Sequence, residues 1–136
     1  MRQKVAVYFD FWKSMVSWVN MYLKNLDDED LKMEITPNGN HGVWILGHLI
    51  ASDDDLSEYL GKGSILFPAY QHLFKQQSQL QAVEKYPSID ILRNHWIQVC
   101  EKNKEIYLRN ATKINLPSVL ILFLPVFVEK PCLSLG

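Results

Sequence analysis

The side chains best suited to chemistry in this 136-residue chain are its four histidines, His41, His48, His72 and His95. An imidazole can bind a metal ion or exchange a proton near neutral pH. A zinc site carried by a single helix needs two histidines at helical spacing, so that both project from one face. Neither an HxxxH pair nor an HExxH motif occurs in the sequence. No helix of this chain is therefore expected to bind a metal ion unaided.

His48 is the strongest candidate, because it borders the apolar face of a predicted helix. That face comprises Ile45, Leu49, Leu56, Tyr59 and Leu60. On a helical wheel His48 lies between this arc and Trp44, whereas Asp53 and Asp54 fall outside the arc. We expect the ring to point into the interior, where an unpaired polar group costs about 1–3 kcal/mol. Its partner could be a carbonyl, a carboxylate or a metal ion, and a hydrogen-bonded core histidine is the commoner case.

The other histidines are weaker candidates. His41 precedes His48 by two helical turns, about 10 Å along the axis, which is too far for one ion with bonds of about 2.0–2.1 Å to bind both. We interpret His41 as a polar residue at a helix start. His72 falls in a glutamine-rich connection and is predicted to be exposed. His95 lies at the edge of a later apolar stripe and is predicted to be a boundary residue.

Composition excludes several classes of function. The formal net charge is −1 and the 14 basic residues are spread along the chain, which argues against nucleic acid as a partner. Cys100 and Cys132 form no CxxC pair and indicate reduced thiols in a cytoplasmic protein. The longest apolar run, residues 116–128, contains two prolines and is shorter than the ~20 residues of a spanning helix. We expect no membrane segment, and GxSxG, GxGxxG and P-loop motifs are absent.

Three amphipathic helices are predicted to position these residues, over residues 3–25, 42–60 and from 89 towards 110. The first has apolar residues at spacings of three and four, namely Val5, Phe9, Trp12, Val16, Val19 and Leu23. Asn40 is the predicted N-cap of the second helix and Gly61 its stop. Ser88 is the predicted cap of the third, with Asp90 in its first turn. The acidic run 27–30 predicts a solvated connection or a short helical turn, and a short helical piece is expected near 68–74.

These elements predict one all-α domain over residues 1–136. Its architecture is expected to be an up-and-down helical bundle with three clear helices, followed by an irregular apolar C-terminal segment. Residues 116–128 have no polar face and are broken by Pro117 and Pro125, so a continuous helix is not expected there. We expect this segment to pack along the bundle, because burying its apolar surface would stabilise the fold.

Residues 36–49, TPNGNHGVWILGHL, resemble the second-helix signature of the DinB/YfiT-like family, in which an asparagine-containing loop leads into a Trp-x-Leu-Gly-His pattern. Residues 52–54, 59–61, 67–70 and 73–74 are also similar, and the order of elements agrees to about residue 110. The resemblance implies a four-helix bundle, often dimeric, with a divalent nickel or zinc ion held by three histidines. His48 matches the ligand from the second helix. The other two ligands belong on the fourth helix, spaced as HxxxH.

The sequence departs from the family pattern at that fourth helix. No histidine follows Asn110, and the proline-broken segment stands in the place of the helix. One imidazole cannot hold zinc or nickel well against water, because catalytic sites need about three protein ligands. The resemblance therefore implies a protein of the metal-dependent hydrolase or thiol-transferase type whose metal site is degenerate, with metal binding weak or absent and catalytic activity in doubt.

Three functional hypotheses follow from the sequence. The first is a DinB-like protein that has kept the bundle and lost its metal site. The second is a working metalloenzyme, which completes the site with a partner chain or with further ligands such as Asp55 and His95. The third is a non-catalytic helical interaction protein that self-associates through its apolar C-terminal segment. No feature of the sequence identifies a small-molecule substrate.

Overall fold

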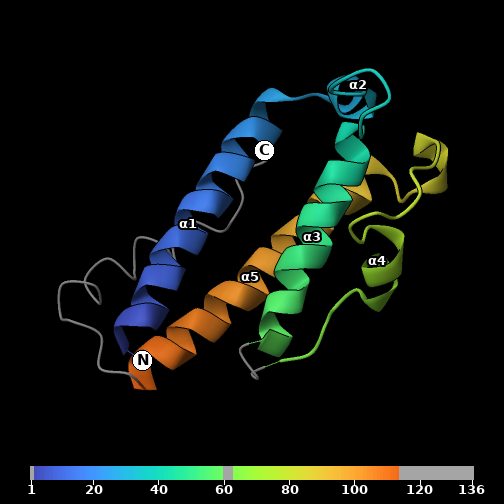
Figure 1. Ribbon diagram of the computed structural model, residues 1–136. Helices are drawn as coiled ribbons and strands as arrows, with labels where there is room; N and C mark the ends of the chain where they lie inside the picture. The colour runs from blue at the N-terminus through green and yellow to red at the C-terminus, as the bar shows by residue number, and fades with distance from the viewer. Residues whose placement is uncertain (1, 60–62, 114–136) are drawn as a thin grey trace. The chain divides into compact units, whose positions relative to one another are not determined.

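The computed structural model describes residues 2–59 and 63–113, and these are all-α, as predicted (Figure 1). The helices are α1 (Arg2–Asn25), α2 (Asp28–Lys32), α3 (Gly42–Tyr59), α4 (Pro68–Leu73) and α5 (Ile89–Lys113), with a 3₁₀ turn at Val83–Lys85. Within those ranges the only β pairing is an isolated bridge between Glu34 and His41. Three predictions fall outside the described residues: the packing of residues 116–128, Leu60 as the last residue of the second helix, and Gly61 as its stop.

The chain divides into two compact units, and the boundary between them falls within α5. The first unit contains α1 and the part of α5 that begins at Cys100. The second unit, Leu26–Val99, contains α2, α3, α4, the 3₁₀ turn and the start of α5. Each unit is described separately below.

The first unit is built on the predicted apolar stripe of α1. Phe9, Trp12, Val16 and Leu23 are all buried. The ring of Tyr107, on α5, lies 5.0 Å from that of Phe9 and 5.4 Å from that of Trp12, measured between centroids. Aromatic pairs at this separation pack favourably beyond the area they bury. The stripe predicted from spacing is therefore the core-facing side of α1.

The acidic run of the second unit forms the short helix α2. Its first turn is closed by a capping box, in which the Asp27 side chain accepts the Asp30 N–H at 2.8 Å and the Asp30 side chain accepts the Asp27 N–H at 2.9 Å. Leu31 is buried against the start of α3. A Cβ atom on Gly42 would lie 2.8 Å from the Leu31 carbonyl oxygen, so only glycine permits this approach.

The predicted N-cap of α3 is wrong by one residue. The capping side chain is His41, whose Nδ1 accepts the Trp44 N–H at 3.1 Å, while Asn40 is exposed. Since Nδ1 accepts, Nε2 carries the proton, and it donates to the Gln81 carbonyl at 3.0 Å. An asparagine at this position could cap the helix but could not also reach that carbonyl. The predicted cap of α5 is confirmed, because Ser88 Oγ accepts the Ile91 N–H at 3.4 Å.

Candidate functional site

Residues 66–81 run antiparallel to α3 along one of its faces. We call this stretch the crossing segment. It contains α4, which lies beside α3 (Figure 1). Hydrogen bonds join Asp54 to Leu66 and Phe67, Ala51 to Gln71, His48 to Phe74, Trp44 to Ser78 and His41 to Gln81. From His41 to Ala51, each step of three or four residues along α3 is matched by an equal step back along the crossing segment. The register follows from helix geometry, because residues at those spacings share a face.

His48 makes one of these hydrogen bonds between α3 and the crossing segment. Its Nδ1 lies 2.6 Å from the Phe74 carbonyl oxygen, and its half-buried ring stacks on Trp44 with centroids 4.8 Å apart and planes at 8°. A carbonyl oxygen only accepts, so Nδ1 donates and the neutral ring keeps its lone pair on Nε2. Of the three partners considered for this histidine, the structure shows a carbonyl. The same second-shell hydrogen bond orients metal-bound histidines, so the ring geometry by itself is compatible with a ligand.

Among the described residues, His48 has no set of ligands around it that could form a catalytic metal centre. Residues 2–59 and 63–113 contain no group of three or more histidine, cysteine, aspartate or glutamate side chains that could hold a metal ion. His95 and Asp55, the further ligands considered from the sequence, are both half-buried and do not complete such a group. In this part of the chain, the residues present do not fit the three-ligand site that the family resemblance implies.

Gly47 allows the crossing segment to approach α3 closely. A Cβ atom there would lie 2.3 Å from the ring of Phe74, which is fully buried. The Phe74 ring therefore occupies the space that any larger residue at position 47 would need. Trp44 makes a further contact, donating its indole N–H to Ser78 Oγ at 3.1 Å. Trp44, Gly47 and His48, the distinctive residues of the 44–48 motif, thus all contact the crossing segment.

Asp54 anchors the start of the crossing segment, which the helical wheel did not foresee. Its side chain is fully buried, and its two oxygens accept the Leu66 N–H at 3.0 Å and the Phe67 N–H at 2.8 Å. Asp53 is also buried. The predicted apolar arc is wrong: Ile45, Leu49 and Leu56 are only half-buried, whereas the buried residues of α3 lie on the other side of the helix. The sequence contains one indication of this contact. Phe67, the residue before Pro68 at the start of α4, has no side chain that could cap that helix, so its backbone needs another partner.

His95 pairs with Tyr70 on the other side of α4. The Tyr70 hydroxyl and His95 Nδ1 are 2.8 Å apart, and the imidazole stacks on the Phe67 ring with centroids 3.9 Å apart. Burial lowers the pKa of His95 and raises the pKa of Tyr70, so both groups favour their neutral forms. His95 is half-buried, as expected of a boundary residue, and His72 is exposed, as predicted.

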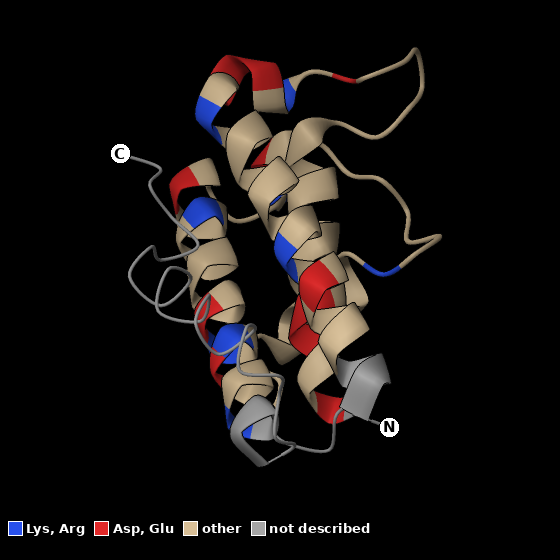
Figure 2. Cartoon of the chain, turned by 90° about the vertical axis from the view of Figure 1, so that its left-hand side faces the viewer, with Lys and Arg blue, Asp and Glu red and all other residues tan. Residues whose placement is uncertain are grey.

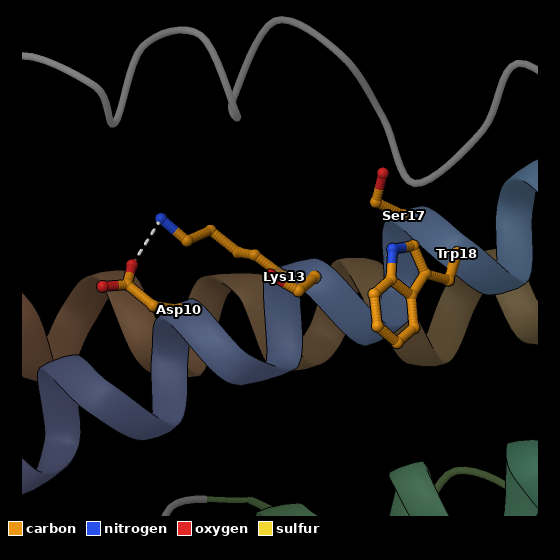
Figure 3. Close-up of a pocket in the computed structure, with 5 residues that line it drawn as sticks. Asp10, Lys13, Ser17 and Trp18 are labelled. Carbon is orange, nitrogen blue, oxygen red and sulfur yellow. Dashed lines mark ion pairs between the residues drawn. The ribbon is translucent and has the colours of Figure 1, made fainter.

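A groove of about 390 Å³ lies on α1, lined by Asp10, Lys13, Ser14, Ser17 and Trp18 (Figure 3). Lys13 Nζ lies 2.9 Å from the Asp10 carboxylate and 4.6 Å from the centroid of the Phe9 ring. The lining serines have no histidine beside them to act as a general base. A second groove of about 620 Å³ lies beside α4 and is lined by three glutamines and by Ala69, Leu73, His72, Lys75 and Ser78. The Ser78 hydroxyl accepts the indole N–H of Trp44.

Basic and acidic residues are mixed in sequence along the described helices, as the view in Figure 2 shows. Cys100 is a fully buried thiol, consistent with a structural role. None of the helices described is both long and apolar enough to cross a membrane.

No protein-family model matches the chain, and no curated protein matches its sequence.

Proposed function

We propose that this protein is a DinB-like helical bundle that acts in the cytoplasm as a non-catalytic interaction protein, with the 44–48 motif kept as a structural element. The observation that carries the proposal is the engagement of the motif with the crossing segment. His48 donates to the Phe74 carbonyl, Gly47 lies against the Phe74 ring, and Trp44 donates to Ser78. Each contact provides a physical reason for the residue type that does not involve a metal ion.

An exposed apolar surface supports the interaction role. α1 carries six large apolar side chains that are more than half exposed: Val7, Tyr8, Phe11, Trp18, Met21 and Tyr22. We call this surface the aromatic face of α1. Single exposed apolar residues are ordinary in globular proteins, but a contiguous row along one helix is typical of a protein-binding surface.

The proposal is tested by separating structure from metal binding at His48. Replacing His48 with alanine should lower the free energy of unfolding by about 1–3 kcal/mol, because the Phe74 carbonyl loses its donor. The exposed His72→Ala substitution is the matched control and should have almost no effect. Addition of nickel or zinc should leave the stability of the wild-type protein unchanged, as measured by urea denaturation. Purified protein should retain far less than one metal ion per chain after dialysis.

The metalloenzyme hypothesis is the second candidate, favoured by the orientation of His48. Its Nδ1–H bond to a carbonyl leaves the lone pair of Nε2 available, and metal-bound histidines use this arrangement. Two ligands would then have to come from a partner chain or from residues outside the described part. Retention of about one nickel or zinc ion per chain, lost in His48→Ala, would establish this candidate and overturn the interaction proposal.

A further inference from the structure

The groove of about 620 Å³ beside α4 presents a row of amide side chains. Gln77, Gln79 and Gln81 are exposed and all line it, so we call it the glutamine groove. Side chains two residues apart in an extended chain lie on one side, about 6.4–6.8 Å apart. Each amide offers both a hydrogen-bond donor and an acceptor. The spacing therefore matches the repeat of a second extended chain lying alongside.

The backbone of the same stretch has an open edge. Residues 78–82 contain no helix, turn or bend. One edge is bonded within the protein, because the Gln81 carbonyl accepts from His41 and the Gln81 N–H donates to the Tyr86 hydroxyl. Neighbouring residues of an extended chain direct their backbone groups to opposite edges, so those of Leu80 face the other way. Within the described part of the chain, the N–H and C=O groups of Leu80 make no hydrogen bond. Such an edge is a template for pairing with another chain.

The lining of the glutamine groove can carry positive charge and carries no negative charge. It contains Lys75 and His72, both exposed, and neither aspartate nor glutamate. Among residues 2–59 and 63–113, Lys75 has no ion-pair partner. A carboxylate on a bound molecule would therefore find a cation there that is not already paired.

Gln77 places an amide where the backbone favours glycine. The chain turns over residues 75–78, where the Ser78 N–H donates to the Lys75 carbonyl at 3.0 Å. Gln77 has a φ of 66° in this turn, a conformation that glycine adopts most easily. The turn by itself gives no reason for glutamine, whereas the groove uses its side chain as part of the lining.

We propose that the glutamine groove binds an extended peptide segment of another protein, one that carries an acidic side chain. The peptide adds as a strand beside residues 78–82 and pairs its backbone with that of Leu80. Its side chains on one face meet the amides of Gln79 and Gln81, and its carboxylate meets Lys75. The groove lies in the second unit and the aromatic face of α1 in the first, so this is an additional interaction site beyond the proposed function.

Selection of phage-displayed eight-residue peptides on the full-length protein tests the charge preference. The selected peptides should contain aspartate or glutamate. Their affinity, measured by fluorescence anisotropy, should fall about twofold to fivefold in Lys75→Gln, through loss of an exposed ion pair. Lys85→Gln is the matched control and should bind as the wild type does, because Lys85 is exposed and does not line the groove. Failure to select any peptide, or equal affinity in Lys75→Gln and the wild type, would overturn the proposal.

Gln77→Gly separates binding from folding. Glycine suits the positive φ, so urea denaturation should show a stability no lower than that of the wild type. The affinity for a selected peptide should fall about threefold to tenfold, because one hydrogen-bonding amide is lost. Gln76→Ala is the control, since Gln76 is exposed and does not line the groove. Equal affinity in Gln77→Gly and the wild type would remove the amide row from the site and contradict the proposal.

An N-methyl scan of a selected peptide tests the extended pairing. Each backbone N–H of the peptide is methylated in turn, which removes one donor at a time. Successive N–H groups of a strand point to opposite edges, so affinity should fall at every second position and stay nearly unchanged between them. Uniform tolerance along the peptide, or losses at helical intervals of three and four residues, would show that the peptide does not add as a strand and would overturn the proposal.

Discussion

The Nδ1 atom of His48 lies 2.6 Å from the carbonyl oxygen of Phe74, 26 residues further along the chain. This contact links the most distinctive motif of the sequence to the segment that crosses α3. A histidine bonded in this way stabilises the fold whether or not a metal ion is bound. The predictions below concern the residues on either side of this contact and the groups that share its register.

Gly47→Ala should destabilise the protein, although alanine is the better helix former by about 1 kcal/mol. A Cβ atom at this position would lie 2.3 Å from the Phe74 ring, so overpacking should cost about 1–3 kcal/mol or more. In a double-mutant cycle with Phe74→Leu, measured by urea denaturation, the two losses should be less than additive. Additive losses would show that the ring does not occupy this space.

Asp54→Asn should release the start of the crossing segment. The Asp54 carboxylate accepts two backbone N–H groups with its two oxygens, whereas an amide side chain offers one acceptor. The free energy of unfolding should fall by about 1–3 kcal/mol. Hydrogen exchange of the Leu66 and Phe67 amides should accelerate, and Asp55→Asn, at the adjacent half-buried residue, should leave both amides protected. Unchanged exchange in Asp54→Asn would contradict the anchoring role.

His41→Asn should separate the two hydrogen bonds of the α3 cap. Asparagine can still cap the helix, so the expected loss of about 1 kcal/mol comes from the Gln81 carbonyl, which loses its donor. Asn40→Ala is the control and should change stability by less than about 0.5 kcal/mol, since Asn40 is exposed and does not cap the helix. A larger effect at Asn40 than at His41 would restore Asn40 as the cap.

Stability should fall in mild acid because of His95. Burial holds the pKa of His95 below its ordinary value of about 6.5, so the unfolded chain binds the proton more tightly. The contribution of His95 is therefore fully present above about pH 6.5 and is lost as the pH falls through the pKa of the folded state. Urea denaturation from pH 7.5 to pH 5 should show a shallower pH dependence in His95→Gln than in His72→Gln. Equal pH dependence in the two variants would exclude His95 as the source.

Local patterns in the sequence determined the helices and much of their termini. The spacing of Phe9, Trp12, Val16 and Leu23 specified the core-facing side of α1, and Ser88 specified the start of α5, because periodicity and capping depend on residues a few positions apart. The exposure of His72 also followed from its neighbours. By contrast, the DinB-like resemblance, the metal role of His48 and the homodimer stay predictions, because no contact among the described residues tests them.

The partners of α3 depended on long-range pairing, which local patterns do not contain. Asn40 was a good cap by residue type, yet His41 caps the helix because its second nitrogen also binds the Gln81 carbonyl, 40 residues away. Asp54 lies off the apolar arc and is nevertheless fully buried, because the crossing segment brings two backbone N–H groups to its carboxylate. The helical wheel chose the side of α3 with Ile45, Leu49 and Leu56, which is only half-buried. Only the folded chain shows that the opposite side is buried and that polar side chains satisfy the backbone there.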